Sequence, residues 1–316
     1  DPTSTPFQTT IARGRVTNDL YQLQEDSLAA VRDNAAVEGA AATSQTLIPT
    51  VLRSNRTQIL EKTILISGTA DAVDTYGRTN ETAYQSQKAA LEIKRDLEAQ
   101  LIGRAQNAVA GDAASIPRRF GNLLGNDAAG NPIIATRTPA GTFSAATPSP
   151  TAGAPLSEED ILGTHQTLFE NGSDPTVLMI TPKDSEVVAG FAQSAGRERD
   201  FGSTRSVVNV VDLYVSPYGE LRVVLNRFLQ RFIPDDGAVD LGETLDPTPT
   251  NDGDTNPDQL GVALLFDPDM FDLSTLRRFT RTELARDGDA RRFQLLGEYG
   301  FKHANYLDSA LIVDLS

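Results

Sequence analysis

The sequence contains no cysteine, no tryptophan and only two histidines. Without cysteine, a disulfide framework, a thiolate metal site and a cysteine nucleophile are all excluded. His165 lies in an ordinary helical pattern and His303 is far from it along the chain, so we expect each to have a structural role. No apolar run approaches the roughly 20 residues of a membrane-spanning helix, which predicts no membrane partner.

Lysine is also scarce, and the net charge is −15. An overall negative charge disfavours nonspecific binding to nucleic acid or to anionic membranes. An acidic, lysine-poor surface is typical of proteins in concentrated salt, where the Debye length is about 3 Å near 1 M. Ordinary acidic proteins share this composition, so a halophilic source and a mesophilic source both remain open. The lysines are Lys62, Lys88, Lys94, Lys183 and Lys302.

Motifs of common enzymes are missing: there is no phosphate-binding glycine loop, no nucleophile elbow and no HExxH zinc helix. One acidic loop has the every-second-residue spacing of a calcium loop. However, Pro257 stands at the position of the turn glycine and Ala263 at that of the closing glutamate. We therefore favour a solvated acidic loop and keep loose cation binding as the alternative. The candidate ligands are Asp252, Asp254, Asn256 and Asp258.

The clearest element is one long helix over residues 81–102, which contains neither Gly nor Pro. Thr79 or Asn80 can cap its start, and Glu81 is well placed in its first turn. Its apolar stripe is narrow, and its length would be about 35 Å. We therefore expect it to lie across a surface and not inside a bundle.

Two strand-like runs, 46–52 and 57–67, precede this helix and predict a hairpin that turns at residues 53–56. A short helix is expected just before them, over 27–39. The second run carries apolar residues on both faces, so it needs a partner on each side, which indicates packing between subunits. The interface candidates from this region are Arg53, Asn55, Arg56, Ile59, Lys62 and Ile64.

The remainder of the chain predicts a second α+β unit and then further strands. Residues 103–155 read as a loop or extended strap, and a helix capped by Ser157 opens the second unit. An Asp-, Pro- and Gly-rich loop covers 234–259. After it comes an arginine cluster, from which we select Arg277, Arg278 and Arg281 as interface candidates. We favour contacts with neighbouring subunits or intramolecular ion pairs over nucleic acid, because interleaved aromatics and a groove-reading helix are absent.

A series of segments, in the same order along most of the chain, resembles the major capsid proteins of tailed viruses (Caudoviricetes) with the Hong Kong 97 fold. Within that fold the resemblance is to the SU10-like group, and the acidic composition leaves open a haloarchaeal virus. The strap at 125–155 and the acidic loop depart from the group's pattern. The matching segments are NRTQI at 55–59, ISGT at 66–69, AVDTYGR at 72–78, the helix residues 84–98, NGSDPTVLMITP at 171–182, VDLYVSPYGELRVVLNRFL at 211–229 and ELARDGDARRFQLLGEYGFKHAN at 283–305.

The resemblance implies an α+β subunit with five parts. These are an N-terminal arm (1–39), an extended β-hairpin loop (40–78), a peripheral domain with the long spine helix and strap (79–155), an axial domain with the acidic loop (156–261), and C-terminal strands of the peripheral domain (262–316).

The implied function is assembly into hexamers and pentamers of an icosahedral shell that encloses double-stranded DNA in the virion, without catalysis or a cofactor. The expected partners are other copies of the chain, decoration or turret proteins, a portal, and nonspecifically contacted DNA. Two alternatives stay open at this point. One is a decoration or tail subunit, and the other is a metal-dependent hydrolase that uses Asp267 and Asp269 or the acidic loop.

Overall fold

The computed structural model describes residues 4–39, 41, 44, 47–73, 81–103, 106–112, 116–137, 143–144, 154–194, 212–230, 261–286 and 288–315. No helix in these ranges has the length and apolar character needed to cross a membrane. The elements, in chain order, are α1 (Pro6–Thr10), β1 (Ala12–Arg15), β2 (Leu20–Glu25), β3 (Val51–Ser67), α2 (Gly68–Ala72), α3 (Glu81–Ile102), β4 (Ala135–Arg137), β5 (Phe143–Ser144), α4 (Glu158–Glu170), β6 (Val177–Ile180), α5 (Pro182–Ser194), β7 (Leu213–Ser216), β8 (Gly219–Leu225), η1 (Arg227–Gln230), β9 (Gly261–Phe266), η2 (Pro268–Met270), β10 (Phe271–Glu283), β11 (Ala290–His303) and β12 (Ala310–Leu315).

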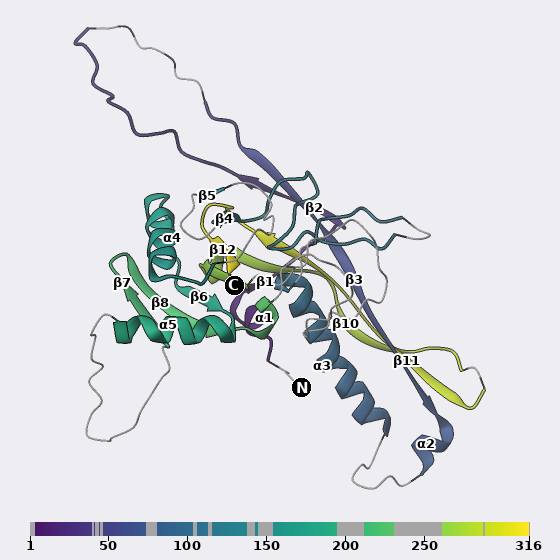
Figure 1. The fold of residues 1–316 in the computed structure, drawn as a ribbon. Helices are drawn as coiled ribbons and strands as arrows, with labels where there is room; N and C mark the ends of the chain where they lie inside the picture. The colour runs from purple at the N-terminus through teal and green to yellow at the C-terminus, as the bar shows by residue number, and fades with distance from the viewer. Residues whose placement is uncertain are drawn as a thin grey trace.

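The first sheet is a long twisted ribbon with the strand order β1-β10-β11-β3-β2, and α3 runs along one of its faces (Figure 1). Side chains alternate between the two faces of a strand. In β3, Leu60 is buried in the core and Ile64 packs against it, and Ile66 on the same face is buried too, whereas Ile59 and Leu65 on the other face are exposed. The predicted helix 81–102 is confirmed, and its stripe covers the inner face of this sheet through Ile93, Leu97 and neighbouring buried residues.

The second sheet has the order β5-β4-β12-β9-β6-β8-β7. The helices α4 and α5 lie beside it, near β6, β7 and β8 (Figure 1). The resemblance implies that residues 262–316 are C-terminal strands of the peripheral domain. In the structure β10 and β11 belong to the first sheet, whereas β9 and β12 pair with each other and, through β9, with β6 of the second sheet. These short strands are almost continuously apolar because both of their faces are buried, and such runs carry no signal about which sheet they join. One hydrophobic core spans both sheets and α3.

The prediction of a hairpin that turns at residues 53–56 is wrong. Those residues lie inside β3, a single strand of 17 residues. The antiparallel partner of its first third is β2, with Leu20 opposite Arg56 and Glu25 opposite Val51. The connection over residues 26–50, which was expected to be partly helical, has no helix in its described residues. We call Leu20–Ser67 the extended hairpin and residues 26–50 its tip.

Residues 103–155 were predicted to be a loop or extended strap, and the described residues between 106 and 134 form a folded loop that covers the first sheet near the base of the extended hairpin. Phe120, Leu123 and Leu124 are buried in the core. Backbone packing is tight, because a Cβ at Gly121 would lie 2.1 Å from the Asn126 carbonyl oxygen and one at Gly125 would lie 2.0 Å from that of Gln106. Small residues here reflect close backbone approach, which composition alone cannot distinguish from a flexible linker.

Candidate assembly surface

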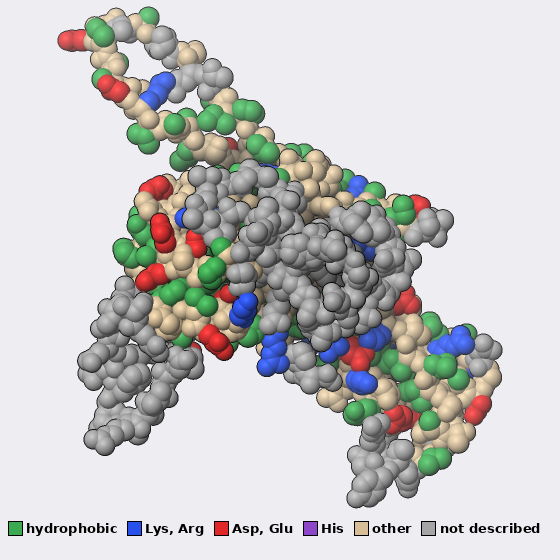
Figure 2. Space-filling model, in the orientation of Figure 1, with side chains coloured by type: hydrophobic (Ala, Val, Ile, Leu, Met, Phe, Trp, Pro, Cys, Tyr) green, Lys and Arg blue, Asp and Glu red, His purple; other side chains and the backbone are tan. Residues whose placement is uncertain are grey.

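The tip of the extended hairpin projects far from the body of the subunit, and apolar side chains follow one another along it (Figures 1 and 2). Leu28, Val31 and Leu47 are 97%, 102% and 88% exposed. Such exposure is unusual for large apolar residues gathered on one segment and marks an interaction surface. Sequence reasoning placed a hairpin in this region but missed these residues. Among the described residues, the exposed large apolar side chains on the tip and the start of β3 are Leu28, Val31, Val37, Leu47, Ile48, Val51 and Leu52.

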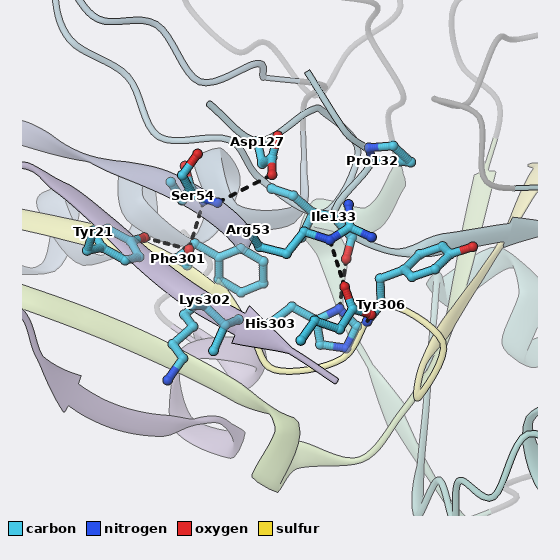
Figure 3. A pocket seen from close by; sticks show the side chains of 13 residues that line it. Tyr21, Arg53, Ser54, Asp127, Pro132, Ile133, Phe301, Lys302, His303 and Tyr306 are labelled. Atoms are coloured by element: carbon cyan, nitrogen blue, oxygen red, sulfur yellow. Dashed lines mark hydrogen bonds and ion pairs between the residues drawn. The ribbon is translucent and has the colours of Figure 1, made fainter. Parts of the chain in front are cut away.

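The base of the extended hairpin is held firmly to the body, in part around a pocket (Figure 3). Arg53 Nε donates to Glu25 at 2.7 Å, and the guanidinium lies 5.1 Å from the centre of the Tyr306 ring. On the sheet side, the Tyr21 hydroxyl donates to the Phe301 carbonyl oxygen at 2.6 Å. Burial raises the pKa of Tyr21, so this hydroxyl stays a donor. Arg53, an interface candidate, is therefore engaged within its own subunit.

Asn55 was another interface candidate, but it is buried and fully bonded inside the subunit. Its Nδ2 donates to the carbonyl oxygens of Gly121 and Phe301, both at 2.8 Å. Its Oδ1 accepts from the backbone N–H groups of Gly121 and Arg56, again at 2.8 Å. The side chain thus joins β3, β11 and the 106–134 loop, and we do not carry it forward as an interface residue.

The remaining candidates on β3 divide by face. Ile59 is 45% exposed on the outer face, beside Leu65 at 61%. Lys62 and Ile64 point to the inner face, where Lys62 forms an ion pair with Glu92 of α3 and Ile64 packs against the core. Ile59 is therefore the β3 candidate best placed to meet a neighbouring subunit.

The arginine cluster is largely used in intramolecular contacts. Arg277 donates to the buried Glu298 at 2.8 Å, and Glu298 also pairs with Arg118. Arg281 donates to Ser86 of α3 and stacks over Phe293. Arg278 is exposed and makes no ion pair within the described ranges. The intramolecular interpretation therefore holds for Arg277 and Arg281.

One pair of residues resembles a catalytic dyad that the sequence did not suggest. Ser216 Oγ lies 2.8 Å from His165 Nδ1. The same oxygen accepts backbone N–H groups of Tyr218 and Gly219 and donates to the Gly219 carbonyl oxygen. Its hydrogen bonds are thus used to fix the β7–β8 turn. Burial lowers the pKa of His165, in keeping with a neutral ring in the core.

Within the described residues no group of His, Asp or Glu side chains could hold a metal ion. The candidate cation loop at Asp252–Asp258 lies outside those residues.

Comparison with known proteins gives the same family across the whole chain. A family model described as SU10 major capsid protein matches residues 1–316. The major capsid protein of Escherichia phage Phieco32 is 29% identical over 345 residues, covering 98% of this chain and 90% of the relative.

Two solved capsids share the fold at low sequence identity. The capsid of a native GTA particle has a TM-score of 0.61 at 10% identity, covering 100% of this chain and 91% of that one. The capsid of cyanophage P-SCSP1u has a TM-score of 0.56 at 12% identity, covering 98% and 88% respectively. The mixed α+β architecture is thus that of phage capsid subunits.

The family match over the whole chain agrees with two features of the structure. The extended hairpin projects from the body and exposes apolar side chains, and the hydrogen bonds of Ser216, including the one to His165, stabilise the β7–β8 turn. The chain belongs to the SU10 major capsid protein family: it is a structural protein of a tailed phage and not an enzyme, and its place is the capsid shell of the virion.

Proposed function

We propose that the subunit builds hexamers and pentamers of an icosahedral shell around double-stranded DNA, and that its extended hairpin binds a second copy of the chain. The observation that carries this proposal is the projecting tip, whose large apolar side chains have almost no cover within their own subunit. A segment of this kind gains most of its stability when a partner buries it. Many such contacts, each modest, hold a closed shell together.

Within the subunit we propose the Hong Kong 97 division into an N-terminal arm (1–39), an extended loop (40–78), a peripheral domain (79–155 and 262–316) and an axial domain (156–261). Two observations refine these bounds. The pairing of β2 with β3 supports starting the extended loop at Leu20. The pairing of β9 and β12 with the second sheet supports moving both strands to the axial side.

The proposal is tested by shortening the tip. Residues 27–49 are replaced by a short Gly-Ser linker, which leaves β2 and β3 intact. We expect the shortened chain to keep the thermal unfolding transition of the unassembled subunit and to form no shells under electron microscopy. Shells of normal appearance from the shortened chain would refute the role of the tip. The matched control replaces the same residues by a scrambled sequence of equal length and composition, which separates length from specific contacts.

The acidic, lysine-poor composition supports a second proposal, that the shell is adapted to concentrated salt, as in a haloarchaeal virus. High salt screens repulsion between acidic neighbours. Shells should then persist in molar salt and dissociate on dilution, as followed by light scattering. Equal stability in dilute buffer would count against it.

The further partners that we propose are a portal, decoration or turret proteins, and DNA contacted nonspecifically from inside. The net charge of −15 and the internally paired arginines both support weak contact with DNA. Filter binding of shell fragments to duplex DNA tests this, and we expect little retention at physiological salt.

A further inference from the structure

Glu98 lies on the buried face of α3 and is 0% exposed, although it is a carboxylate. Three N–H donors converge on it. The backbone N–H groups of Phe7 and Gln8 donate to its two oxygens at 2.7 and 3.0 Å, and Asn226 Nδ2 donates to Oε1 at 2.8 Å. The Glu98 side chain thus joins three segments that are far apart in the sequence: α3 itself, the N-terminal segment at Phe7 and Gln8, and the junction between β8 and η1 at Asn226.

The N-terminal segment held in this way is part of the core. Phe7 is fully buried, and its ring lies 5.7 to 6.0 Å from the rings of Phe266, Phe271 and Phe301. Gln8 adds a bond from its side-chain amide to the Lys94 carbonyl oxygen at 2.6 Å. Residues 5–11 therefore behave as a plug that closes the core against α3.

The third segment is the junction between β8 and η1. Asn226 is fully buried, and its own N–H donates to the Ile180 carbonyl oxygen at 3.0 Å. Its Oδ1 accepts the N–H of Phe228 at 2.9 Å. Through Asn226, Glu98 fixes the point where the chain leaves the second sheet.

No cation balances the charge of Glu98 within the described residues. The N-terminal segment and the junction face it with the uncharged groups of Phe7, Gln8 and Asn226. The charged residues next to these contacts are Lys94, Arg95 and Asp96 on α3 and Arg227 on η1, all at least partly exposed. The ionised carboxylate depends on N–H donors alone, which is a costly way to bury a charge.

We propose that Glu98 is a proton-controlled latch, which docks the N-terminal plug and the β8–η1 junction onto the spine helix together. The proposal concerns the single subunit and does not depend on shell formation. Burial raises the pKa of Glu98, and the donors from Gln8, Phe7 and Asn226 oppose that rise only in part. Docking therefore takes up a proton in the pH range between the solvent-exposed and the docked pKa. Acid favours the docked state, and raising the pH weakens it.

Hydrogen exchange measured by mass spectrometry on the unassembled full chain tests the latch, after correction for intrinsic exchange rates. From about pH 4 to about pH 8, the protection factor of residues 5–11 should fall, by up to about tenfold per pH unit within the titration range. Residues 226–230 should lose protection with the same midpoint. Residues 290–299 of β11, which leave out His303, should show no such midpoint.

Three variants make the test decisive. Glu98→Gln is neutral at every pH, so the pH dependence of both segments should disappear. Asn226→Ala removes a donor to the carboxylate and should move the midpoint to higher pH. Glu92→Gln, on the same helix but paired with Lys62 at the surface, should change nothing. A flat pH profile in the unmodified chain, or different midpoints for the two segments, would overturn the proposal. So would an unmoved midpoint in Asn226→Ala, a readout that remains if Glu98→Gln fails to fold.

Discussion

Replacing Leu28, Val31 and Leu47 together by serine should leave the subunit folded and block its assembly. All three side chains are at least 88% exposed in the subunit, so the free energy of unfolding should change by less than about 0.5 kcal/mol. Burial of three such side chains in a contact is worth roughly 5 to 9 kcal/mol. Ordering them costs about 0.5 to 1.5 kcal/mol each. The net loss per hairpin, about 3 to 5 kcal/mol, corresponds to a contact weakened by about 100-fold or more.

The assay combines two measurements on the same preparation. Sedimentation velocity over a range of protein concentrations gives the threshold for shell formation, and circular dichroism gives the melting temperature of the unassembled chain. The matched control is Leu213→Ser, at a side chain that is 47% exposed on β7 and outside the hairpin. An unchanged threshold in the triple variant would refute the assignment of the tip as the main contact. A lowered melting temperature would show that these residues pack within their own subunit.

Three further outcomes are expected. Asn55→Ala leaves the backbone N–H and carbonyl groups of Gly121 without partners in a buried site. The free energy of unfolding from urea titrations should therefore fall by about 3 kcal/mol, and a loss below about 1 kcal/mol would contradict the importance of these hydrogen bonds. Burial lowers the pKa of His303 to about 4. The folded protein therefore has its full stability above the unfolded-state pKa near 6.5, and its free energy of unfolding should fall by about 3 kcal/mol as the pH drops toward 4. His303→Phe should flatten this part of the pH profile measured by urea unfolding, and an identical slope in the variant would contradict the prediction. Because the Lys62 ammonium is paired with Glu92 of its own subunit, denatured shells should migrate as single chains on gels, and a ladder of multimers would show covalent crosslinking instead.

Local signals were sufficient for several elements. The length of α3 follows from the absence of Gly and Pro between Glu81 and Ile102, and Gly103 comes directly after its end. The start of α4 follows from a capping box in which Ser157 Oγ accepts the N–H of Asp160 and the Asp160 carboxylate accepts the N–H of Ser157. The β7–β8 turn falls on SPYG at 216–219, whose Pro and Gly are typical turn residues, and Gly288 has a positive φ of 72°, which favours glycine. Each of these depends on residues within one turn of each other.

The errors share a physical cause, which is that the partner lies far away in the sequence. β3 was divided in two because residues 53–56 are polar, yet Asn55 is polar in order to bond Gly121 and Phe301. Phe7 lies in the segment implied to be an N-terminal arm and its neighbours in the sequence are polar, yet it fills the centre of the core. The interface candidates on β3 stay a prediction, and which of their side chains face outward depends on a register that only β2 and β11 reveal.

The continuity of β3 has a mechanical consequence. The strand is 17 residues long, about 55 Å at 3.3 Å per residue, and it passes from the hairpin into the middle of the first sheet without a break. Val51–Arg56 pair with β2, which the same pull draws outward, and Thr57–Ser67 pair with β11. A pull on the tip along the strand therefore loads the hydrogen bonds between β3 and β11 all at once, in shear. Unzipping one hydrogen bond at a time would require far less force. Tension applied by a neighbour should therefore reach β11 and α3 directly, and the subunit should behave as a stiff tie rod and not as a body with a flexible tether.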